Sequence, residues 1–422
     1  MKYDVVIIGG GFAGLSAVQQ AIERGLTCCV IADKTGASQH FSGAFDLIDP
    51  RWLNRQAGVS EPVQLSDSIE SFIRAHPQHL YATSAEHDAD FTRKLPHAMQ
   101  SFLQFYNLPH DGDGEQNAIV FAATGAPKPT AFALAGMSLS PQDIAANPAV
   151  TFLHTPHLTD YPQNLIAANL QKIFHTVTPI RFDWTVNTSS PLAFLLQEFE
   201  NESSVERLIT QLRGKMGGAT VLFLPPILGI RQADVNRSKL ASALGVRVVE
   251  LLSALPSTAG LRFKSGIEQK FAQNNITRIA GRVTSFTAEE QCLQTVTVKS
   301  ASDGEDVILS AKEFILASGK FTGGGIRHQD RFEESIFNLP LSCGVTPVTA
   351  QSHVSSLLAP HAHDAQAFLS LGVTVDAAGR PTAHGRPLWQ NLKACGHVLT
   401  GFDFTRERCG FGASVASALR CF

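Results

Sequence analysis

A glycine-rich turn near the N-terminus constrains the fold of this chain more than any other feature. Residues 4–8 form a short apolar run rich in β-branched side chains, which is typical of a buried parallel strand. The run leads directly into the spacing Gly9-x-Gly11-x-x-Gly14, which is followed by a stretch with helical periodicity. Residues 26–32 then have the composition of a second buried strand. A strand, a turn, a helix and a strand within about thirty residues predict a Rossmann-like unit.

The three glycines of this turn have distinct expected roles. Gly9 permits the tight turn, Gly11 lets a pyrophosphate approach the backbone, and Gly14 lets the helix pack closely on the strand. The helix N-terminus offers unpaired N–H groups and a partial positive charge to an anion. We therefore predict that a nucleotide-type cofactor is bound by the turn residues Gly9, Gly11, Phe12, Ala13 and Gly14. The alternative is a glycine-rich turn of an α/β sheet that binds nothing.

One residue of the dinucleotide-binding pattern is missing. An acidic side chain normally ends the second strand and hydrogen-bonds the adenosine ribose. In this chain that place falls on Ala32, and Asp33 comes one residue later. Either Asp33 takes over the role through a shifted strand end, or the adenosine half of the cofactor is held poorly or is absent.

Composition narrows the class of protein. The length of 422 residues predicts two interleaved domains, and 44% hydrophobic residues suffice for a large core. The formal net charge of -3 argues against nucleic acid as a partner. The seven cysteines include no C-x-x-C pair, so no iron–sulfur or other metal site is predicted, and electrons must leave through another subunit or a diffusible carrier. No apolar run reaches membrane-spanning length and no signal peptide precedes the first strand, so we expect an intracellular protein that can dock on a membrane-bound partner.

The pattern of predicted elements suggests that one domain interrupts the other. The chain between about residues 50 and 265 first shows helical periodicity and then alternates short apolar strands with helical stretches. Strands return afterwards, and Asp303-Gly304 predicts a hairpin turn between two of them. We predict an α/β fold in which residues 1–50 and 266–422 form a discontinuous, Rossmann-like FAD/NAD(P)-binding domain, and residues 51–265 form an inserted α+β substrate domain.

Small residues near predicted strand ends are further candidates for cofactor binding. The loop after the second strand carries Ser42 and Gly43, and in proteins with this N-terminal unit it often passes near the cofactor. His40 in the same loop could donate to a flavin or exchange a proton near neutral pH, and the alternative is an ordinary loop histidine. A later buried strand ends at Ser318 and Gly319, where small side chains let the backbone approach a bulky group.

The C-terminal segment has the composition of a second glycine-rich helix start. Gly401, Phe402 and Asp403 precede Gly410 and Gly412, which open a helix of small residues. Such a helix N-terminus can lie under the electron-rich edge of an isoalloxazine ring, where its dipole stabilises the anionic reduced flavin. The segment therefore adds five candidates for cofactor binding.

The N-terminal glycine turn, the strand that ends at Gly319 and the C-terminal glycine segment together resemble the two-dinucleotide-binding-domain flavoprotein superfamily. Residues 40–47, the missing ribose acid and residues 395–403 resemble more narrowly the family of B subunits of anaerobic glycerol-3-phosphate dehydrogenase. The resemblance spans the chain from end to end. It departs from that family's closing glycine run at Phe411.

The resemblance implies a bacterial enzyme that oxidises sn-glycerol 3-phosphate to glycerone phosphate and passes the electrons to a quinone in anaerobic respiration. It implies FMN as the cofactor of this subunit, with FAD as the alternative, and Val283 is a further candidate for cofactor binding. It also implies two partners, a catalytic A subunit that carries FAD and an iron–sulfur C subunit. The C subunit would hold the pair on the cytoplasmic face of the inner membrane.

Two other interpretations stay open. A self-sufficient FAD oxidoreductase of the fumarate-reductase type, acting on a small acid, would need arginines to converge, the candidates being Arg231, Arg262, Arg282 and Arg327. A structural subunit with a decayed flavin site would need neither a cofactor nor a catalytic base. The sequence assigns no catalytic base beyond His40 and no ligand for a substrate phosphate, because such groups must meet in space.

Overall fold

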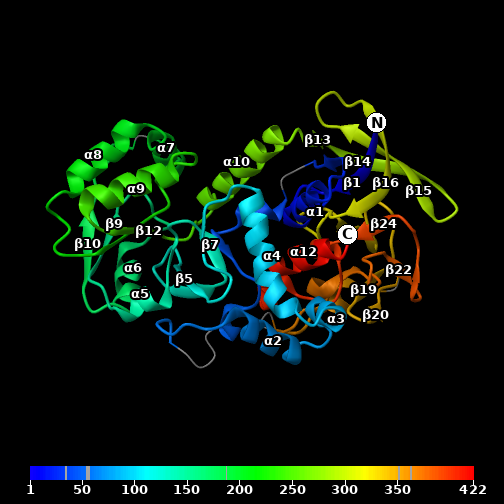
Figure 1. Ribbon diagram of the computed structural model, residues 1–422, viewed down its shortest axis with the longest axis horizontal. Helices are drawn as coiled ribbons and strands as arrows, with labels where there is room; N and C mark the ends of the chain where they lie inside the picture. The colour runs from blue at the N-terminus through cyan, green and yellow to red at the C-terminus, as the bar shows by residue number, and fades with distance from the viewer. Residues whose placement is uncertain (34–35, 54–57, 187, 350–351, 362–363) are drawn as a thin grey trace.

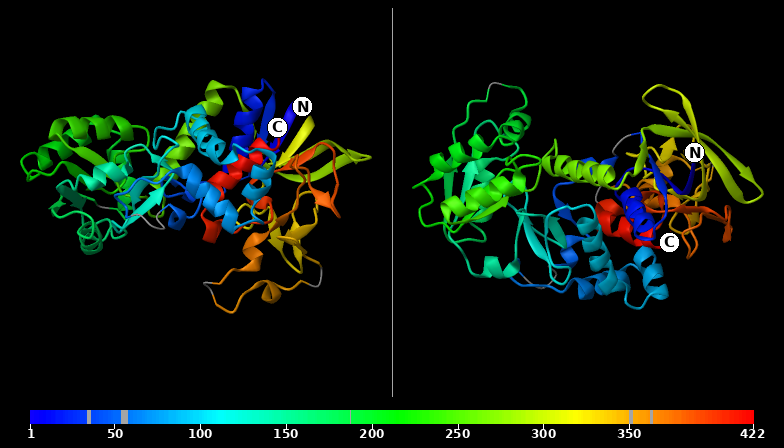
Figure 2. Two further views of the ribbon diagram at one scale, coloured as in Figure 1. Left: turned by 60° about the horizontal axis from the view of Figure 1, so that its bottom comes forward. Right: turned by 45° about the horizontal axis from the view of Figure 1, so that its top comes forward.

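The computed structural model describes residues 1–422 except 34–35, 54–57, 187, 350–351 and 362–363. The chain forms two lobes, and both termini lie in the same one (Figure 1). Each lobe is built around its own sheet, and helix α10 (Thr258–Gln273) runs between them (Figures 1 and 2).

The first lobe contains a seven-stranded sheet assembled from distant parts of the chain. Its order is β13-β2-β1-β16-β15-β14, and β24 also pairs with β16. The pairs among β13, β2, β1, β16 and β24 are parallel, whereas β14, β15 and the first half of β16 pair antiparallel. The strands are β1 (Lys2–Ile8), β2 (Cys28–Ile31), β13 (Thr277–Ile279), β14 (Gly281–Glu289), β15 (Cys292–Ser300), β16 (Asp306–Leu316) and β24 (Leu392–Ala394).

The predicted N-terminal unit is confirmed as β1, helix α1 (Phe12–Glu23) and β2. α1 ends before Gly25, whose positive φ of 70° stops the helix. The predicted hairpin at Asp303-Gly304 is also confirmed, but the strand after it runs without a break to Leu316. One long strand forms there because its first half pairs with β15 and its second half with β1 and β24.

Helices from three regions cover the first sheet. α12 (Gly410–Leu419) packs against α1, and α3 (Leu80–His87) and α4 (Phe91–Phe105) pack in turn against α12. α2 (Leu65–Ala75) packs against α4. The rings of Phe72 and Phe102, from α2 and α4, are fully buried in the same core as β1. Residues 65–105 therefore belong to the core of the first lobe.

The second lobe is built on a parallel sheet of four strands in the order β10-β9-β11-β12. Its apolar core draws on residues between 119 and 251. The strands are β9 (Val150–His154), β10 (Val177–Arg181), β11 (Val221–Leu224) and β12 (Arg247–Glu250), and the helices are α6 (Gln163–Leu170), α7 (Pro191–Glu198), α8 (Glu202–Leu212) and α9 (Ala233–Leu244). This parallel sheet arises because α6 and α9 carry the chain back over it between strands.

Short elements complete both lobes. Two antiparallel sheets, β3-β7-β4 and β6-β5-β8, are built from strands between residues 44 and 139. All of these strands except β3 fall within residues 51–265, so that region holds antiparallel strands as well as the parallel sheet. These elements are β3 (Ala44–Phe45), β4 (His110–Asp111), β5 (Ala118–Phe121), β6 (Pro127–Thr130), β7 (Phe132–Leu134), β8 (Ser138–Leu139) and α5 (Pro141–Ala145). Later come β17 (Ile326–His328), β18 (Phe332–Glu334), β19 (Leu341–Cys343), β20 (Thr346–Pro347), β21 (Leu371–Val373), β22 (Thr382–Ala383), β23 (Arg386–Pro387), α11 (Phe404–Glu407) and five short 3₁₀ segments.

The predicted α/β fold class with a Rossmann-like unit is confirmed. The domain bounds, 1–50 with 266–422 and 51–265, remain a prediction. Residues 65–105 fall within the predicted inserted domain but pack into the core of the first lobe. None of the described helices is long and apolar enough to span a membrane.

Candidate functional site

The three glycines of the N-terminal turn differ in whether the fold requires them. Gly9 and Gly14 are required by close packing, and Gly11 is not. Gly9 has a φ of +126°, and a Cβ there would lie 2.1 Å from the carbonyl oxygen of Ala317, the residue that follows β16. A Cβ on Gly14 would lie 1.9 Å from the carbonyl oxygen of Gly9. Gly11 has an ordinary extended backbone, and the nearest atom to its Cβ position is Ser38 Oγ at 3.6 Å. A Cβ at Gly11 would thus make an ordinary contact, so neither the backbone nor the packing of the protein requires a glycine at this position.

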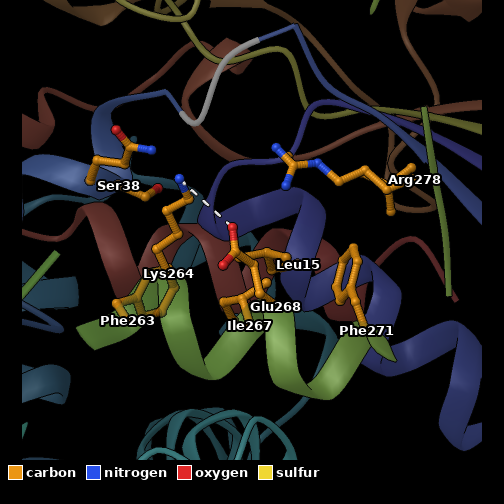
Figure 3. Close-up of a pocket in the computed structure, with 11 residues that line it drawn as sticks. Leu15, Ser38, Phe263, Lys264, Ile267, Glu268, Phe271 and Arg278 are labelled. Atoms are coloured by element: carbon orange, nitrogen blue, oxygen red, sulfur yellow. Dashed lines mark ion pairs between the residues drawn. The ribbon is translucent and has the colours of Figure 1, made fainter. Parts of the chain in front are cut away.

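A pocket adjoins this turn between α1 and α10, and Figure 3 shows its lining. Gly10 and Ser38 line it together with Lys264, Glu268 and Arg278. Its cavity volume is about 30 Å³, and the figure rises to about 450 Å³ only when the open space at its mouth is counted. Lys264 Nζ lies 3.7 Å from Glu268 Oε1, whereas the guanidinium of Arg278 extends from β13 toward the pocket (Figure 3). Glu268 offsets the charge of Lys264, so the net positive charge of the pocket comes from Arg278, which, with the Ser38 hydroxyl beside a helix N-terminus, suits a phosphate.

The acid at the end of β2 is already paired. Asp33 Oδ2 accepts a hydrogen bond of 2.7 Å from Arg282 Nη2 on β14, and both side chains are partly exposed. Val283, next to Arg282, is buried in the sheet. The backbone N–H of Phe12, at the start of α1, donates to Ser38 Oγ at 3.0 Å. Binding of a ribose by Asp33 remains a prediction, and it would require the carboxylate to serve a second partner.

The loop after β2 is held against the second lobe. The carbonyl oxygen of Ser42 accepts a hydrogen bond from the backbone N–H of Ser253 at 2.8 Å. Gly43 has a φ of +114°, and a Cβ there would lie 2.6 Å from Met137 Sδ. Close packing thus explains Gly43 without a ligand. His40 is exposed at the end of the 3₁₀ segment Ala37–His40, and its predicted role in proton exchange remains a prediction.

A cluster of aromatic rings lies beside the glycine turn and includes the unexpected Phe411. The ring centroid of Phe411 lies 4.7 Å from that of Phe12, 5.2 Å from Phe45 and 5.7 Å from Phe41, all in edge-to-face arrangements. Phe263 on α10 is stacked with Phe12 at 5.9 Å. The departure from the glycine run at Phe411 therefore has a packing reason, because its ring joins α12 to α1 and to the loop after β2.

Strand β16 delivers two of the predicted residues to the same place. Ser318 follows the end of β16, and its Oγ is buried without a hydrogen-bond partner in the described part of the chain. Its backbone nitrogen would lie 3.0 Å from a Cβ on Gly9. Gly319 has a φ of +72°, which turns the chain away from the sheet. The hydroxyl itself packs against Gly325, where a Cβ would lie 2.4 Å from Ser318 Oγ, so only the backbone of Ser318 is shown to adjoin the glycine turn.

The C-terminal glycines hold the start of α12 close to its neighbours. A Cβ on Gly412 would lie 2.0 Å from the hydroxyl of Tyr81, and one on Gly410 would lie 2.8 Å from His397 Nε2. Gly396, just before this segment, approaches Ala13 on α1 in the same way. Among the predicted residues, the structure thus brings the turn, Ser318, Gly319, Gly410 and Gly412 together.

Around Phe402 lies a group of polar residues, of which the sequence analysis named Asp403 alone as a candidate. The ring of His79 lies 5.6 Å from the buried Phe402 ring, His397 lies at 6.0 Å, and Lys320 Nζ lies 5.8 Å from its centroid. Burial lowers the pKa of Lys320 to about 8, and the nearby Asp403 carboxylate opposes this shift. Lys320 donates to the carbonyl oxygen of Leu369 at 2.5 Å.

The other end of this group lies at the N-terminus of α12. Asp403 caps α11 by accepting from the backbone N–H of Thr405, but its Oδ2 is buried and unpartnered among the described residues. Burial raises the pKa of Glu407 to about 7. Cys409, directly before α12, is fully buried. No motif marks His79, which is 330 residues away from Cys409 in the sequence.

Three of these groups converge as metal ligands often do, but the hydrogen bonds favour another arrangement. His79 Nε2 lies 3.3 Å from Cys409 Sγ and 3.7 Å from Glu407 Oε2. His79 Nδ1, however, accepts a hydrogen bond of 3.1 Å from the backbone N–H of Tyr81. The neutral ring must then keep its proton on Nε2, whereas a histidine that ligates a metal usually donates from its other nitrogen. The geometry therefore favours a hydrogen bond from Nε2–H to the cysteine sulfur.

Because two histidines are buried in their neutral form, we expect the free energy of unfolding of this protein to fall in mild acid. Burial lowers the pKa of His79 to about 3, and burial together with Lys320 lowers that of His397 to about 4. The unfolded chain takes up these protons near pH 6.5, so the stabilisation is complete above that pH. It is lost as the pH falls, at about 1.4 kcal/mol per pH unit and per histidine. Glu407 acts in the opposite sense: with its raised pKa it stabilises the fold below about pH 4.5, and this contribution is lost as the pH rises toward 7.

Replacement of Glu407 by glutamine should therefore make the acid sensitivity steeper. Between pH 6.5 and 4.5 the variant lacks the group that offsets one histidine, so its free energy of unfolding should fall about 1.4 kcal/mol more per pH unit than that of the wild type. Denaturant unfolding at a series of pH values measures both slopes. The exposed Glu305→Gln change serves as the control. Equal slopes in Glu407→Gln and the wild type would show that Glu407 titrates normally.

The arginines do not converge as a small-acid oxidoreductase would need. Arg262 is bound to Glu250 at the junction of the lobes, and Arg282 is bound to Asp33 at the end of β2. Arg231 is exposed after β11, and the backbone around it is held by Glu200. Arg327, the fourth candidate, lies on β17 next to Ile326 of the first lobe's core, so the four arginines belong to separate parts of the fold.

Comparison with known proteins shows which groups this chain resembles. The family described as "FAD binding domain" matches residues 4–413. A protein of Pectobacterium atrosepticum, named as the B subunit of anaerobic glycerol-3-phosphate dehydrogenase, is 28% identical over 99% of this chain and 97% of its own length. A protein of Yersinia pestis with the same name is 26% identical over 99% of this chain and 97% of its own. The predicted resemblance to this group of B subunits is thus confirmed.

Solved structures show a more distant likeness. The open conformation of a flavocytochrome c3 fumarate reductase is similar over 99% of this chain and 77% of its own, with 10% identity and a TM-score of 0.44. A 3-ketosteroid dehydrogenase from Rhodococcus jostii RHA1 covers 100% of this chain and 96% of its own, with 10% identity and a TM-score of 0.43.

Proposed function

This chain belongs to the FAD binding domain family, and from that premise we propose that it is the flavin-carrying B subunit of an anaerobic, respiratory glycerol-3-phosphate dehydrogenase. The reaction removes two electrons and two protons from sn-glycerol 3-phosphate, which yields glycerone phosphate, and a quinone takes them up. When bound, the flavin supplies the two-electron acceptor for such a reaction. The end-to-end similarity to relatives with this name supports the proposal. The observation that carries it is that neither backbone strain nor packing requires glycine at Gly11, where the motif expects a phosphate to approach.

We propose FMN as the cofactor, with FAD as the alternative. A terminal phosphate carries about −1.5 to −2 charges at neutral pH, and the pocket beside the turn offers Lys264 and Arg278 to such a group. The pairing of Asp33 with Arg282 leaves the ribose acid of an FAD site partly engaged. The description of the matching family favours FAD instead. The proposed binding residues are Gly9, Gly11, Phe12, Ala13, Gly14, Asp33, Ser42, Gly43, Val283, Ser318, Gly319, Gly401, Phe402, Asp403, Gly410 and Gly412.

The subunit designation of the relatives supports a complex. We propose an A subunit that carries FAD and performs catalysis, and an iron–sulfur C subunit that anchors the pair on the cytoplasmic face of the inner membrane. Electrons would pass through the C subunit to the quinone. This division suits a chain in which the cysteines lack the spacing of an iron–sulfur site.

The visible absorbance of the purified chain tests the cofactor directly. We expect a yellow protein with flavin bands, and mass spectrometry of the group released by acid should identify FMN. Release of FAD would assign the ribose to Asp33 or to backbone groups. A colourless protein that binds neither flavin on addition would contradict the proposal and favour a structural subunit.

Activity with glycerol 3-phosphate and a dye acceptor tests the place of the chain in the complex. We expect the isolated chain to be inactive and the complex with the A subunit to reduce the dye. If the isolated chain alone oxidised a small acid at a comparable rate, the self-sufficient oxidoreductase would be the correct assignment. If it alone oxidised glycerol 3-phosphate, the division of labour between the A and B subunits would be wrong.

A further inference from the structure

We propose that His79 is a positioning residue of the cofactor site, which holds the first turn of α12 through a hydrogen bond to Cys409. The inference rests on the proposed function, because α12 is the helix whose N-terminus is expected to face the flavin. His79 belongs to the segment that leads into α3, a region far from every glycine of the cofactor site in the sequence. It is therefore a residue that the glycine motifs alone do not indicate.

The orientation of the His79 ring is determined by its own helix. The side chain is 1% exposed and lies at the N-cap of α3, where Nδ1 accepts the backbone N–H of Tyr81 at 3.1 Å. Because Nδ1 is the acceptor, Nε2 carries the proton. A buried N–H needs a partner, since leaving it unpaired costs roughly 1–3 kcal/mol. α2, α4 and α12 all pack against α3, and the residues that lie nearest to Nε2 are those just before α12.

Cys409 and Glu407 supply that partner. His79 Nε2 lies 3.3 Å from Cys409 Sγ and 3.7 Å from Glu407 Oε2, and Cys409 Sγ lies 3.9 Å from the same carboxylate oxygen. The arrangement lets Nε2–H donate to the sulfur while the S–H donates to Glu407. The backbone carbonyl of Cys409 accepts the N–H of Ala413 at 2.7 Å, which starts the hydrogen bonding of α12. An anchor on Cys409 is therefore an anchor on the first turn of α12.

A second contact between α3 and α12 lies one helical turn beyond Cys409, at Gly412. The Tyr81 hydroxyl donates to the carbonyl oxygen of Leu47 at 2.7 Å and occupies the space beside Gly412 that a Cβ would fill. Phe411, between these two contacts in sequence, has its ring against Phe12 at the glycine turn. The start of α3 thus determines how the N-terminus of α12 is presented to the glycine turn. Displacement of this N-terminus would weaken the stabilisation of negative charge on a reduced flavin.

Two substitutions at His79 separate this role from simple helix capping. Asparagine places an acceptor near the position of Nδ1 and keeps the cap of α3, but it lacks the Nε2–H donor. Glutamine places an N–H donor near the position of Nε2 and can preserve the bond to Cys409. The exposed His87→Asn change on the same helix is the matched control. The readouts are the flavin dissociation constant, the midpoint potential of the bound flavin and the melting temperature.

We expect His79→Asn to bind flavin roughly tenfold more weakly than the wild type. Its bound flavin should have a more negative midpoint potential, and His79→Gln should restore both quantities. His87→Asn should match the wild type. If the flavin-loaded His79→Asn protein has the wild-type potential, His79 contributes only to folding and the inference is overturned.

Labelling of Cys409 provides a readout that does not depend on flavin. A maleimide should modify this buried thiol in native His79→Asn protein faster than in the wild type or in His79→Gln, and peptide mass spectrometry identifies the site. Unchanged labelling in His79→Asn would show that His79 does not anchor the thiol. A wild-type protein that binds no flavin would refute the proposed function, and the labelling would still decide whether His79 holds α12.

Discussion

Replacement of Gly11 by valine should abolish flavin retention and leave the protein folded. The backbone of Gly11 is extended, so any residue can adopt it, and the nearest atom to its Cβ position is 3.6 Å away. We expect the free energy of unfolding to fall by about 1 kcal/mol, because valine is a poorer helix N-cap than glycine. The valine side chain would fill the space where a phosphate approaches the start of α1. The flavin-to-protein ratio after gel filtration, together with denaturant unfolding, measures both effects.

The neighbouring glycine of the same turn gives the matched control. Gly9→Ala introduces a Cβ at a φ of +126° and 2.1 Å from the carbonyl oxygen of Ala317, so β1 and β16 must separate locally. Strain of this kind costs about 1–3 kcal/mol before the clash is counted. Gly9→Ala should therefore destabilise the fold itself, with or without flavin. If Gly11→Val kept its flavin, the glycine turn would not be the binding site, and the pocket beside it would lose its assignment.

Replacement of Arg262 by methionine should cause the largest loss of stability among single changes at the junction of the lobes. The side chains of Arg262 on α10 and Glu250 on β12 are 9% and 1% exposed, and their two hydrogen bonds measure 2.5 and 3.0 Å. Arg262 Nε also donates to the carbonyl oxygen of Gly229 at 2.9 Å. The substitution leaves the Glu250 carboxylate buried and unpaired, which costs about 3–5 kcal/mol. Denaturant or thermal unfolding of the full chain measures the loss.

A double variant distinguishes the unpaired charge from the lost packing. Glu250→Gln combined with Arg262→Met removes both charges and keeps an acceptor for the backbone N–H of Leu228, which Glu250 binds in the wild type. We expect the double variant to recover most of the stability, because a buried ion pair replaced as a whole is often nearly neutral. Arg181→Met, at an exposed ion pair, should cost less than about 1 kcal/mol. A double variant as unstable as Arg262→Met would show that packing of the arginine, rather than charge pairing, joins the lobes.

This ion pair also matters for the cofactor pocket. Arg262 adjoins Phe263 and Lys264 on α10, which line the pocket beside the glycine turn. The second lobe is thus connected to the proposed cofactor site through one helix. Loss of the ion pair should weaken flavin binding and also lower the free energy of unfolding. Gly11→Val should chiefly weaken flavin binding.

Local pattern was enough to predict the N-terminal unit, the hairpin near Asp303 and the fold class. The periodicity of strands and helices depends on neighbouring residues, and the glycine spacing 9, 11, 14 has a backbone meaning of its own. The sequence could not show that the strand after the hairpin is continuous to Leu316, because that depends on which strands lie on either side. Nor could it show that residues 65–105 share a core with β1, since an amphipathic helix does not specify the surface it will cover.

By itself, then, the sequence determined the glycine turn, the candidate glycines at the two helix starts and the family that they indicate. Only the tertiary structure decided which of those glycines packing requires, that Asp33 is paired with Arg282, and that Arg262 joins the lobes. The same holds for His79 and Cys409, which are 330 residues apart in sequence and 3.3 Å apart in space. The physical reason is that hydrogen bonds and ion pairs act over a few ångströms. Which residues form a hydrogen bond or an ion pair depends on how the whole chain packs. A local sequence pattern does not tell how close two distant residues come in space.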